Sequence, residues 1–188
     1  GGTRLHGGES MLGASIRSKR LERELSLRDV AEKTGLTASF LSQVERDLAE
    51  PSITSLRKIA EALEVPIFYF LLDADDQSPV VRSNSRKVLR LPESKLTYEL
   101  LSPDLNRKIE MVMGRLALGG ATCDVPLTHP GEECILVLEG QARIDVGTSV
   151  FHLDPGDSAY YLGSIPHRVV NVGSGELVFV MAITPPVF

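Results

Sequence analysis

The sequence predicts two domains of different class, a helical N-terminal domain followed by an all-β C-terminal domain. Three observations support this division. Between residues 11 and 72, apolar residues recur at helical spacings of three and four. Between residues 88 and 188, short alternating or β-branched runs are separated by Gly, Pro and Asp. Residues 73–87 are acidic, then polar, and have no period, which predicts a linker. The glycine-rich residues 1–10 are expected to be a disordered leader or a cloning remnant.

Two short helices joined at a sharp angle are predicted in residues 26–46. Ser26 precedes an apolar run and is followed three residues later by Asp29, a capping-box pattern that starts a helix. Gly35 can end that helix in a left-handed conformation. Thr37 can cap a second helix. The apolar positions of this second helix are expected to point inward, namely Leu41, Val44 and Leu48.

The opposite face of this second helix carries short polar side chains and no acid: Ser39, Ser42, Gln43 and Arg46. Such side chains bind base edges and phosphates in the major groove of DNA. We expect Gln43 to make the most specific base contact, because its amide can bond bidentately to adenine. Weaker contacts are expected from Ser39 and Ser42. Arg28, Thr37 and Arg46 are expected to position the DNA backbone. The alternative interpretation is an ordinary helical hairpin.

Residues 16–70 resemble the helix-turn-helix domain of the phage-repressor (Cro-like, XRE) family. The resemblance begins at Ile16 and Arg17 and continues through the ER-x-x-x-x-P-S segment, the helix ITSLRKIAEALEV and a fifth helix, IFYFLL. It implies a five-helix, lambda-repressor-like fold that binds double-stranded DNA. Lys19 departs from the family, which usually has an apolar residue there, and Leu21 is expected to take over its packing role.

The formal net charge of -5 argues against a protein that coats nucleic acid nonspecifically, although local charge decides steering. Basic residues cluster in the first two helices, where they could flank phosphates or could form an ordinary solvated face: Arg17, Lys19, Arg20, Arg23 and Arg28. Cys123 and Cys134 have neither metal-site spacing nor a disulfide pattern, so a reducing cytosol is expected. We see no signal peptide and no apolar run that could span a membrane. The expected localisation is cytoplasmic, with no membrane partner.

The second half of the chain predicts a double-sheet jelly roll or a small barrel. KIEMVMGRLAL, ECILVLEGQARIDV and ELVFVMAIT read as strands, and glycine recurs at the turns between such runs. Residues 112–182 resemble a small cupin barrel, a double-stranded β-helix. Two signature segments carry this resemblance, the first with Ala121, Leu127, His129, Glu133 and Gly140, the second with Gly156, Leu162, Ser164, His167 and Asn171.

The resemblance to metal-binding cupins implies four ligands, three histidines and a glutamate. This chain supplies His129, Glu133 and His167, but Leu127 stands at the first histidine position. Three ligands of this type could still hold a divalent metal such as Zn, Fe, Mn or Ni. Alternatively, the two histidines are hydrogen-bonded to Glu133 and line a pocket for a small-molecule effector.

The combined domains resemble the cupin-linked subgroup of XRE transcriptional regulators, which implies that the barrel senses an effector. The predicted function is therefore that of a transcriptional regulator, not an enzyme, that reads a palindromic operator as a homodimer. Two alternatives stay open: a barrel that serves only dimerisation, and a metal-dependent cupin enzyme fused to a DNA-binding domain. The dimer contact is expected at the apolar barrel surface and the IFYFLL segment, for which core packing is the alternative.

Overall fold

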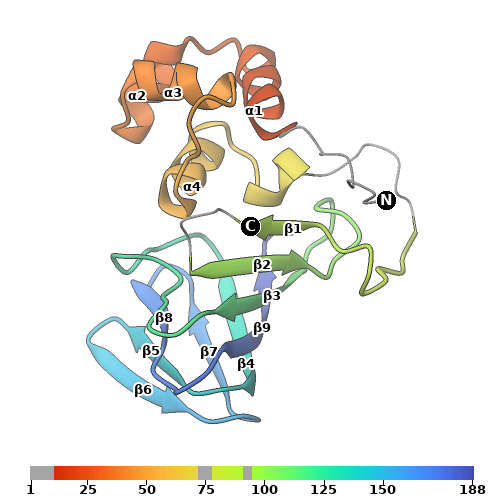
Figure 1. Ribbon diagram of the computed structural model, residues 1–188, viewed down its shortest axis with the longest axis vertical. Coiled ribbons are helices and arrows are strands. Elements are labelled where there is room, and N and C mark those ends of the chain that lie inside the picture. The colour runs from red at the N-terminus through yellow and green to blue at the C-terminus, as the bar shows by residue number, and fades with distance from the viewer. Residues whose placement is uncertain (1–10, 72–77, 91–94) are drawn as a thin grey trace, which may run out of the picture.

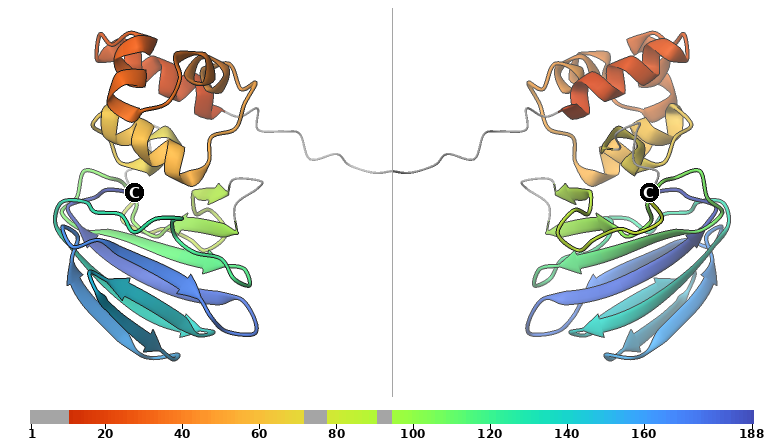
Figure 2. Two further views of the ribbon diagram at one scale, coloured as in Figure 1. Left: turned by 90° about the vertical axis from the view of Figure 1, so that its left-hand side faces the viewer. Right: turned by 90° about the vertical axis from the view of Figure 1, so that its right-hand side faces the viewer.

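The computed structural model describes residues 11–71, 78–90 and 95–188. A helical domain lies against one side of a β-barrel domain, and the last residue, Phe188, lies between the two (Figure 1; Figure 2). The predicted leader, 1–10, and the first part of the predicted linker, 73–77, lie outside the described residues. Residues 78–87 contain neither helix nor strand. No helix in the described part of the chain is long and apolar enough to cross a membrane.

The described residues of the N-terminal domain form five helical segments, in agreement with the predicted fold: α1 (Met11–Glu22), α2 (Leu27–Thr34), α3 (Ala38–Glu45), α4 (Ile53–Ala62) and η1 (Ile67–Leu71). The fifth is a 3₁₀ helix and not an α-helix. It follows Pro66, whose carbonyl accepts a hydrogen bond from the Tyr69 amide at 3.0 Å, the three-residue spacing of a 3₁₀ turn. With only five residues, this segment is too short to make a useful α-helical ladder.

The predicted helix ends are confirmed. Ser26 and Asp29 form a reciprocal capping box at the start of α2. Gly35 ends α2 with φ of 71°, a left-handed conformation that is free of strain for glycine. The Thr37 hydroxyl accepts a hydrogen bond from the Phe40 amide and thereby caps α3. These caps fix the angle between α2 and α3.

Two packing predictions in this domain are wrong. Leu41 and Val44 are buried as expected, but Leu48 is 68% exposed, because α3 ends at Glu45 and the chain changes direction at Asp47, where φ is 54°. Leu21 does not replace Lys19 in the core, since Leu21 is 55% exposed and Lys19 is buried. Lys19 instead packs its aliphatic stem inward, with its ammonium 4.8 Å from the centroid of a tyrosine ring.

The C-terminal domain is the predicted double-sheet barrel. Its strands are β1 (Val88–Arg90), β2 (Leu96–Leu100), β3 (Glu110–Leu116), β4 (Glu132–Glu139), β5 (Ala142–Val146), β6 (Ser149–Leu153), β7 (Ser158–Leu162), β8 (His167–Asn171) and β9 (Leu177–Thr184). Six form one sheet in the order β1-β2-β3-β9-β4-β7, and three form the other in the order β6-β5-β8. All the pairings are antiparallel. The two sheets face each other (Figure 2).

Alternate residues of β4 point into the barrel, because side chains alternate along a strand. Glu133, Ile135 and Val137 are buried, whereas Leu136 and Leu138 face outward and are 40% exposed. An isolated antiparallel bridge pairs Leu127 with His167 at the start of β8. The barrel therefore brings the motif segment before β4 opposite the motif segment that opens β8.

Candidate functional site

The surface of α3 presents the side chains that the sequence predicted for DNA contact. Ser39, Gln43 and Arg46 are exposed and Ser42 is half-buried. The Arg46 guanidinium donates to the Ser42 carbonyl at 3.1 Å, so its charge is held against the end of the helix. Because the buried Leu41 and Val44 anchor the opposite face, the polar face of α3 is available to a partner.

The residues expected to flank the DNA backbone divide into two groups. Arg28 is exposed in the first turn of α2, and Thr37 is exposed at the α2–α3 turn, where its hydroxyl also caps α3. In α1, by contrast, Arg20 is buried in a bidentate ion pair with Glu45, at 2.6 and 2.9 Å, and Lys19 pairs with an acid on its own helix. Arg20 therefore joins α1 to α3 and is not available to a phosphate.

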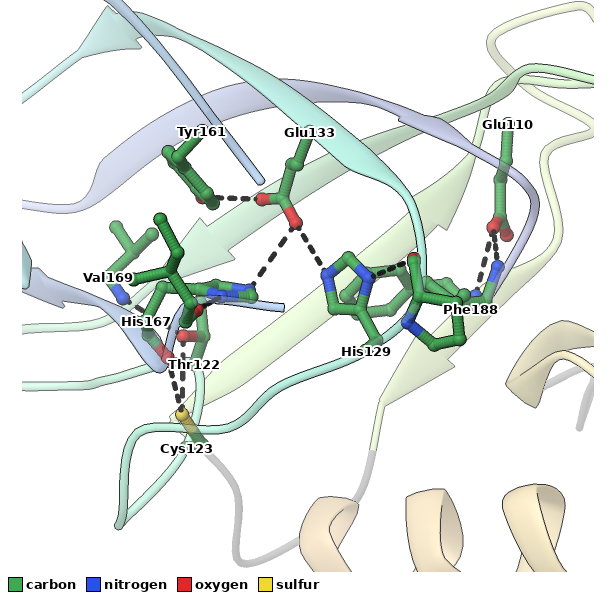
Figure 3. A network of polar contacts seen from close by, with 12 residues as sticks. Glu110, Thr122, Cys123, His129, Glu133, Tyr161, His167, Val169 and Phe188 are labelled. Atoms are coloured by element: carbon green, nitrogen blue, oxygen red, sulfur yellow. Dashed lines mark hydrogen bonds and ion pairs between the residues drawn. The ribbon is translucent and has the colours of Figure 1, made fainter. Parts of the chain in front are cut away.

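Inside the barrel, three predicted residues come together. The Nε2 atom of His129 lies 3.2 Å from Oε2 of Glu133, and the Nε2 atom of His167 lies 3.7 Å from the same oxygen (Figure 3). One potential ligand atom from each residue lies within 4.8 Å of the others. Glu133 is 2% exposed and His167 is 5% exposed, so the cluster is shielded from solvent.

Backbone carbonyls fix the orientation of both imidazoles. The Nδ1 atom of His129 is 2.9 Å from the Pro130 carbonyl, and that of His167 is 2.8 Å from the Ile165 carbonyl. A carbonyl can only accept, so we assign the proton to Nδ1 in each ring. Both Nε2 atoms then direct lone pairs toward a carboxylate oxygen. Lone pairs that face a carboxylate oxygen require a proton or a cation between them. A hydrogen bond from Nδ1 to a backbone carbonyl is also how proteins orient metal-binding histidines.

The electrostatics of the cluster separate the two histidines. Burial lowers the pKa of His129, but the hydrogen bond to Glu133 and the Pro130 carbonyl outweigh it, so this pKa is raised. Burial lowers the pKa of His167, and its net pKa stays below the usual value. The pKa of Glu133 is lowered: burial raises it, and the hydrogen bonds from His129 and Tyr161 outweigh burial. These three pKa shifts are consistent with a proton shared by His129 and Glu133 beside a neutral His167.

The donor set fits a divalent metal. Two imidazole nitrogens and one carboxylate oxygen form the two-histidine, one-carboxylate set that leaves coordination positions open. Leu127 pairs with His167 across the antiparallel bridge, and directly paired residues present their side chains on the same face. Leu127 thus occupies the position from which a fourth ligand would reach the cluster.

Replacing Leu127 by histidine should therefore tighten metal binding. We expect Leu127→His to lower the dissociation constant for Zn²⁺ by about 10- to 100-fold, the range that even outer hydrogen-bond partners of metal ligands contribute. Isothermal titration of the metal-stripped protein measures this. Glu133→Gln is the control and should abolish the gain, because it removes the carboxylate shared by both histidines. Equal affinity in Leu127→His and the unchanged chain would mean that residue 127 does not face the cluster.

Sequence reasoning missed four residues around this cluster. The Tyr161 hydroxyl on β7 donates to Oε1 of Glu133 at 2.7 Å and so leaves Oε2 to the histidines. Tyr98 on β2 is fully buried, and its hydroxyl accepts a hydrogen bond from Arg57 of α4. Glu110 at the start of β3 is fully buried beside Phe188. Tyr161 and Tyr98 occupy inward positions of strands, so the alternation of inward and outward residues could have identified them. Arg57 left no signal, since its partner is 41 residues away.

One glycine makes room for this geometry. A Cβ added to Gly163 would lie 2.5 Å from the His129 ring, and the Gly163 carbonyl accepts the His129 amide at 2.9 Å. The backbone at Gly163 therefore forms part of the wall that holds the imidazole in place.

Comparisons with known proteins support both domains. The helix-turn-helix family (HTH_3) matches residues 16–70, and the cupin family (Cupin_2) matches residues 113–183. The HTH-type transcriptional regulator PuuR of Escherichia coli K12 is 28% identical over 94% of this chain and 96% of its own length. SutR, an HTH-type transcriptional regulator of the same organism, is 25% identical over 89% of this chain and 91% of its length.

A solved structure repeats the whole arrangement. The crystal structure of an HTH_3 family transcriptional regulator from Vibrio cholerae superposes with a TM-score of 0.75 at 25% identity, covering 93% of this chain and 95% of that chain. The chain thus consists of an XRE-type helix-turn-helix domain followed by a cupin domain, and it is homologous to PuuR and other HTH-type transcriptional regulators.

Proposed function

We propose that this protein is a sequence-specific DNA-binding transcriptional regulator whose helix-turn-helix domain reads a palindromic operator and whose cupin barrel senses a small-molecule effector. The observation that carries the proposal is the presence of two candidate binding sites in one chain. One is the exposed polar face of α3, and the other is a buried polar cluster inside an apolar barrel.

DNA reading is supported by the anchoring of α3 as well as by its side chains. Two caps and the buried Arg20–Glu45 ion pair fix this helix in its domain, so its polar face is presented rigidly. A rigid helix can place an amide against one base edge within hydrogen-bond distance. Gln43 can bond bidentately to a base, whereas the Arg46 guanidinium at the end of α3 already donates its Nε hydrogen to the Ser42 carbonyl.

The test is a comparison of two variants on specific and random DNA. Gln43→Ala should cost about 1–3 kcal/mol on a duplex selected from a random library and should leave binding to random DNA almost unchanged. Arg46→Ala should weaken binding to both duplexes alike and should flatten the salt dependence, because it removes a phosphate contact. Fluorescence anisotropy at several salt concentrations measures both. Equal loss on both duplexes for Gln43→Ala would contradict the assignment of base reading to this residue.

Effector sensing is supported by the chemistry of the cluster. His129, Glu133 and His167 are more than a packing core needs, since burial of three polar groups is costly unless they bind something or one another. A barrel used for dimerisation alone does not require them. A bound divalent metal would be held by these three residues and would supply an electrophile to which an effector could coordinate. Without the metal, the same groups would bind a polar effector through hydrogen bonds.

We further propose that the protein is a homodimer that pairs through the outward face of the larger sheet. The structure does not support the predicted dimer contact through IFYFLL, because Ile67, Phe68 and Phe70 are buried within one chain. On the sheet, register places outward-facing apolar residues of four adjacent strands side by side: Met111, Met113, Val180, Ala182, Cys134, Leu136, Leu138, Tyr160 and Leu162. We call this surface, which spans β3, β9, β4 and β7, the β4–β7 face. A contiguous apolar face of this kind is typical of a protein interface.

A charge on this face should dissociate the dimer. Leu136 lies on β4 near the middle of the β4–β7 face. In the proposed dimer, Leu136→Asp would place the aspartates of the two protomers near each other or bury a carboxylate in the contact. We expect the dimer dissociation constant to rise by about 100-fold or more, since such juxtaposition costs several kcal/mol. Sedimentation equilibrium measures it. Phe151→Asp is the control, because Phe151 is 51% exposed on β6 of the other sheet and should have no effect. A monomer at micromolar concentration in the unchanged chain would rule out the proposed dimer.

A further inference from the structure

One side chain of the DNA-binding domain reaches the wall of the barrel. The guanidinium carbon of Arg57, on α4, lies 4.0 Å from the centroid of the Phe188 ring and 6.0 Å from that of Tyr98. Its Nη2 donates to the Tyr98 hydroxyl at 3.3 Å. The two aromatic rings contact each other edge to face at 5.0 Å and are both buried. Arg57 is thus held by a cation–π contact and one long hydrogen bond.

The charges of the His129–Glu133–His167 cluster interact with Arg57 and with the Tyr98 that receives it. Burial raises the pKa of Tyr98, and the charge of Glu133 raises it further, so the Tyr98 hydroxyl lies within electrostatic reach of that carboxylate. The Phe188 and Val187 amides both donate to Glu110 at 2.9 Å. Figure 3 shows His129 between Glu133 on one side and the Glu110–Phe188 contact on the other. A change of charge in the cluster therefore acts on Arg57 and on the residues that hold it.

Two polar atoms at this contact lack hydrogen-bond partners among the described residues. Within the described residues, Nε of Arg57 and Oε1 of Glu110 are buried and have no hydrogen-bond partner. Native proteins rarely leave such atoms unpaired, and strain is one recognised reason for those that remain. Beside this contact, a cleft of about 950 Å³ separates residues 50–55, before and in the first turn of α4, from residues 119–124 of the barrel. Beside Arg57, the helical domain and the barrel are therefore not in full contact.

We propose that Arg57 is the coupling residue between the two domains: its guanidinium rests on Phe188 and Tyr98 in one arrangement, and a change at the barrel cluster releases it. This inference rests on the proposed function, because it requires that both DNA and the barrel site are bound by this chain. It places the allosteric contact on α4 and not in the linker.

The mechanical consequence follows from the packing of the helical domain. The α4 helix packs against α2, and α2 packs against α3, so these helices move together. In a dimer held by its barrels, the seating of α4 sets the separation of the two α3 helices. Binding to a palindrome requires one separation, about one helical turn of DNA. Release of Arg57 would change that separation without changing any residue that touches DNA.

Linkage makes the proposal testable without knowledge of the effector, because DNA binding must perturb the barrel if the barrel perturbs DNA binding. The probe is a duplex selected by the full chain from a random library. Imidazole NMR signals of His129 and His167 are followed as this duplex is added, with the exposed His152 on β6 as an internal reference. Three chains are compared: the unchanged protein, Arg57→Met and Lys58→Met. Lys58 is exposed on the same helix, so its variant removes an equal charge without touching the barrel.

In the unchanged chain and in Lys58→Met, the His129 and His167 signals should shift in step with DNA binding while the His152 signal stays fixed. In Arg57→Met these shifts should disappear, and the duplex affinity should change by about 5- to 150-fold, the usual range of allosteric coupling, because this variant is held in the released arrangement. Lys58→Met should bind the duplex like the unchanged chain. Equal shifts in Arg57→Met would overturn the proposal, and so would their absence in the unchanged chain when it is bound to DNA. If no duplex is selected at all, it is the proposed function that fails. Loss of the folded His152 signal in Arg57→Met would be resolved with Arg57→Lys, which keeps the charge but not the planar stacking and should reduce the shifts.

Discussion

Replacing Glu45 by alanine should destabilise the helical domain by about 3–5 kcal/mol, because it leaves the Arg20 guanidinium buried without its counter-ion. The Arg20 and Glu45 side chains are 11% and 6% exposed, and they form two hydrogen bonds of 2.6 and 2.9 Å between α1 and α3. A third guanidinium hydrogen bond, to the Leu25 carbonyl at 2.8 Å, fixes the arginine in place. An arginine held in this way cannot turn into solvent when its partner is removed.

Urea denaturation followed by far-UV circular dichroism should show the loss as an earlier helical transition, while the barrel unfolds at its original midpoint. The double variant Arg20→Met/Glu45→Leu is the control. It removes both charges together, and a buried ion pair replaced by apolar side chains of similar size is often neutral or stabilising. A cost below about 1 kcal/mol for Glu45→Ala would mean that the pair behaves like a surface salt bridge.

This ion pair also shows what sequence patterns can and cannot predict. Helix caps depend on residues close together in the sequence, and local spacing therefore predicts the roles of Ser26, Asp29, Gly35 and Thr37. Arg20 looked like one member of a basic cluster, because its partner Glu45 is 25 residues away and leaves no periodic signal. Local spacing identifies the ends and faces of elements, whereas partnerships between elements depend on how those elements pack.

The same division holds at the barrel. The motif spacing identified His129, Glu133 and His167, which do come together in the structure. Tyr161 completes the hydrogen bonding of Glu133 from a neighbouring strand, and only the pairing of β4 with β7 brings it there. The predicted linker drew attention to residues 73–87 as the connection between domains. A direct contact between the domains is made by Arg57, 41 positions before Tyr98, through an interface that neither domain's own pattern encodes.

The stability of the barrel should depend on pH through Glu110. This carboxyl is fully buried, and burial raises its pKa to about 7, although the Phe188 and Val187 amides partly oppose the shift. In the unfolded chain the group has its ordinary pKa of 4.5. Between these values the folded state binds more protons than the unfolded state, so stability falls as pH rises. The full interval from 4.5 to about 7 corresponds to about 3 kcal/mol.

Glu110→Gln should remove this loss. A neutral amide has the shape of the protonated carboxyl, and its oxygen can still accept from the two backbone amides. The variant should match the unchanged chain near pH 5 and exceed it by about 3 kcal/mol near pH 8, above the folded-state pKa. Urea unfolding of the barrel across this range measures the difference. A constant gap between the two chains at all pH values would mean that Glu110 ionises as an ordinary carboxyl.

Glu99→Gln supplies a control of opposite sign. Burial raises the pKa of Glu99, but hydrogen bonds from Arg86 and Arg115 outweigh it, so the net pKa is lowered. Its ionised form therefore stabilises the folded state above the unfolded pKa, and this contribution is lost as pH falls. Glu99→Gln should destabilise the barrel near neutral pH and have no effect in acid, whereas Glu110→Gln should have no effect in acid and stabilise the barrel near pH 8. Two glutamates on adjacent strands, β2 and β3, would then differ in sign because Glu99 has two guanidinium partners, whereas the fully buried Glu110 accepts its hydrogen bonds from backbone amides.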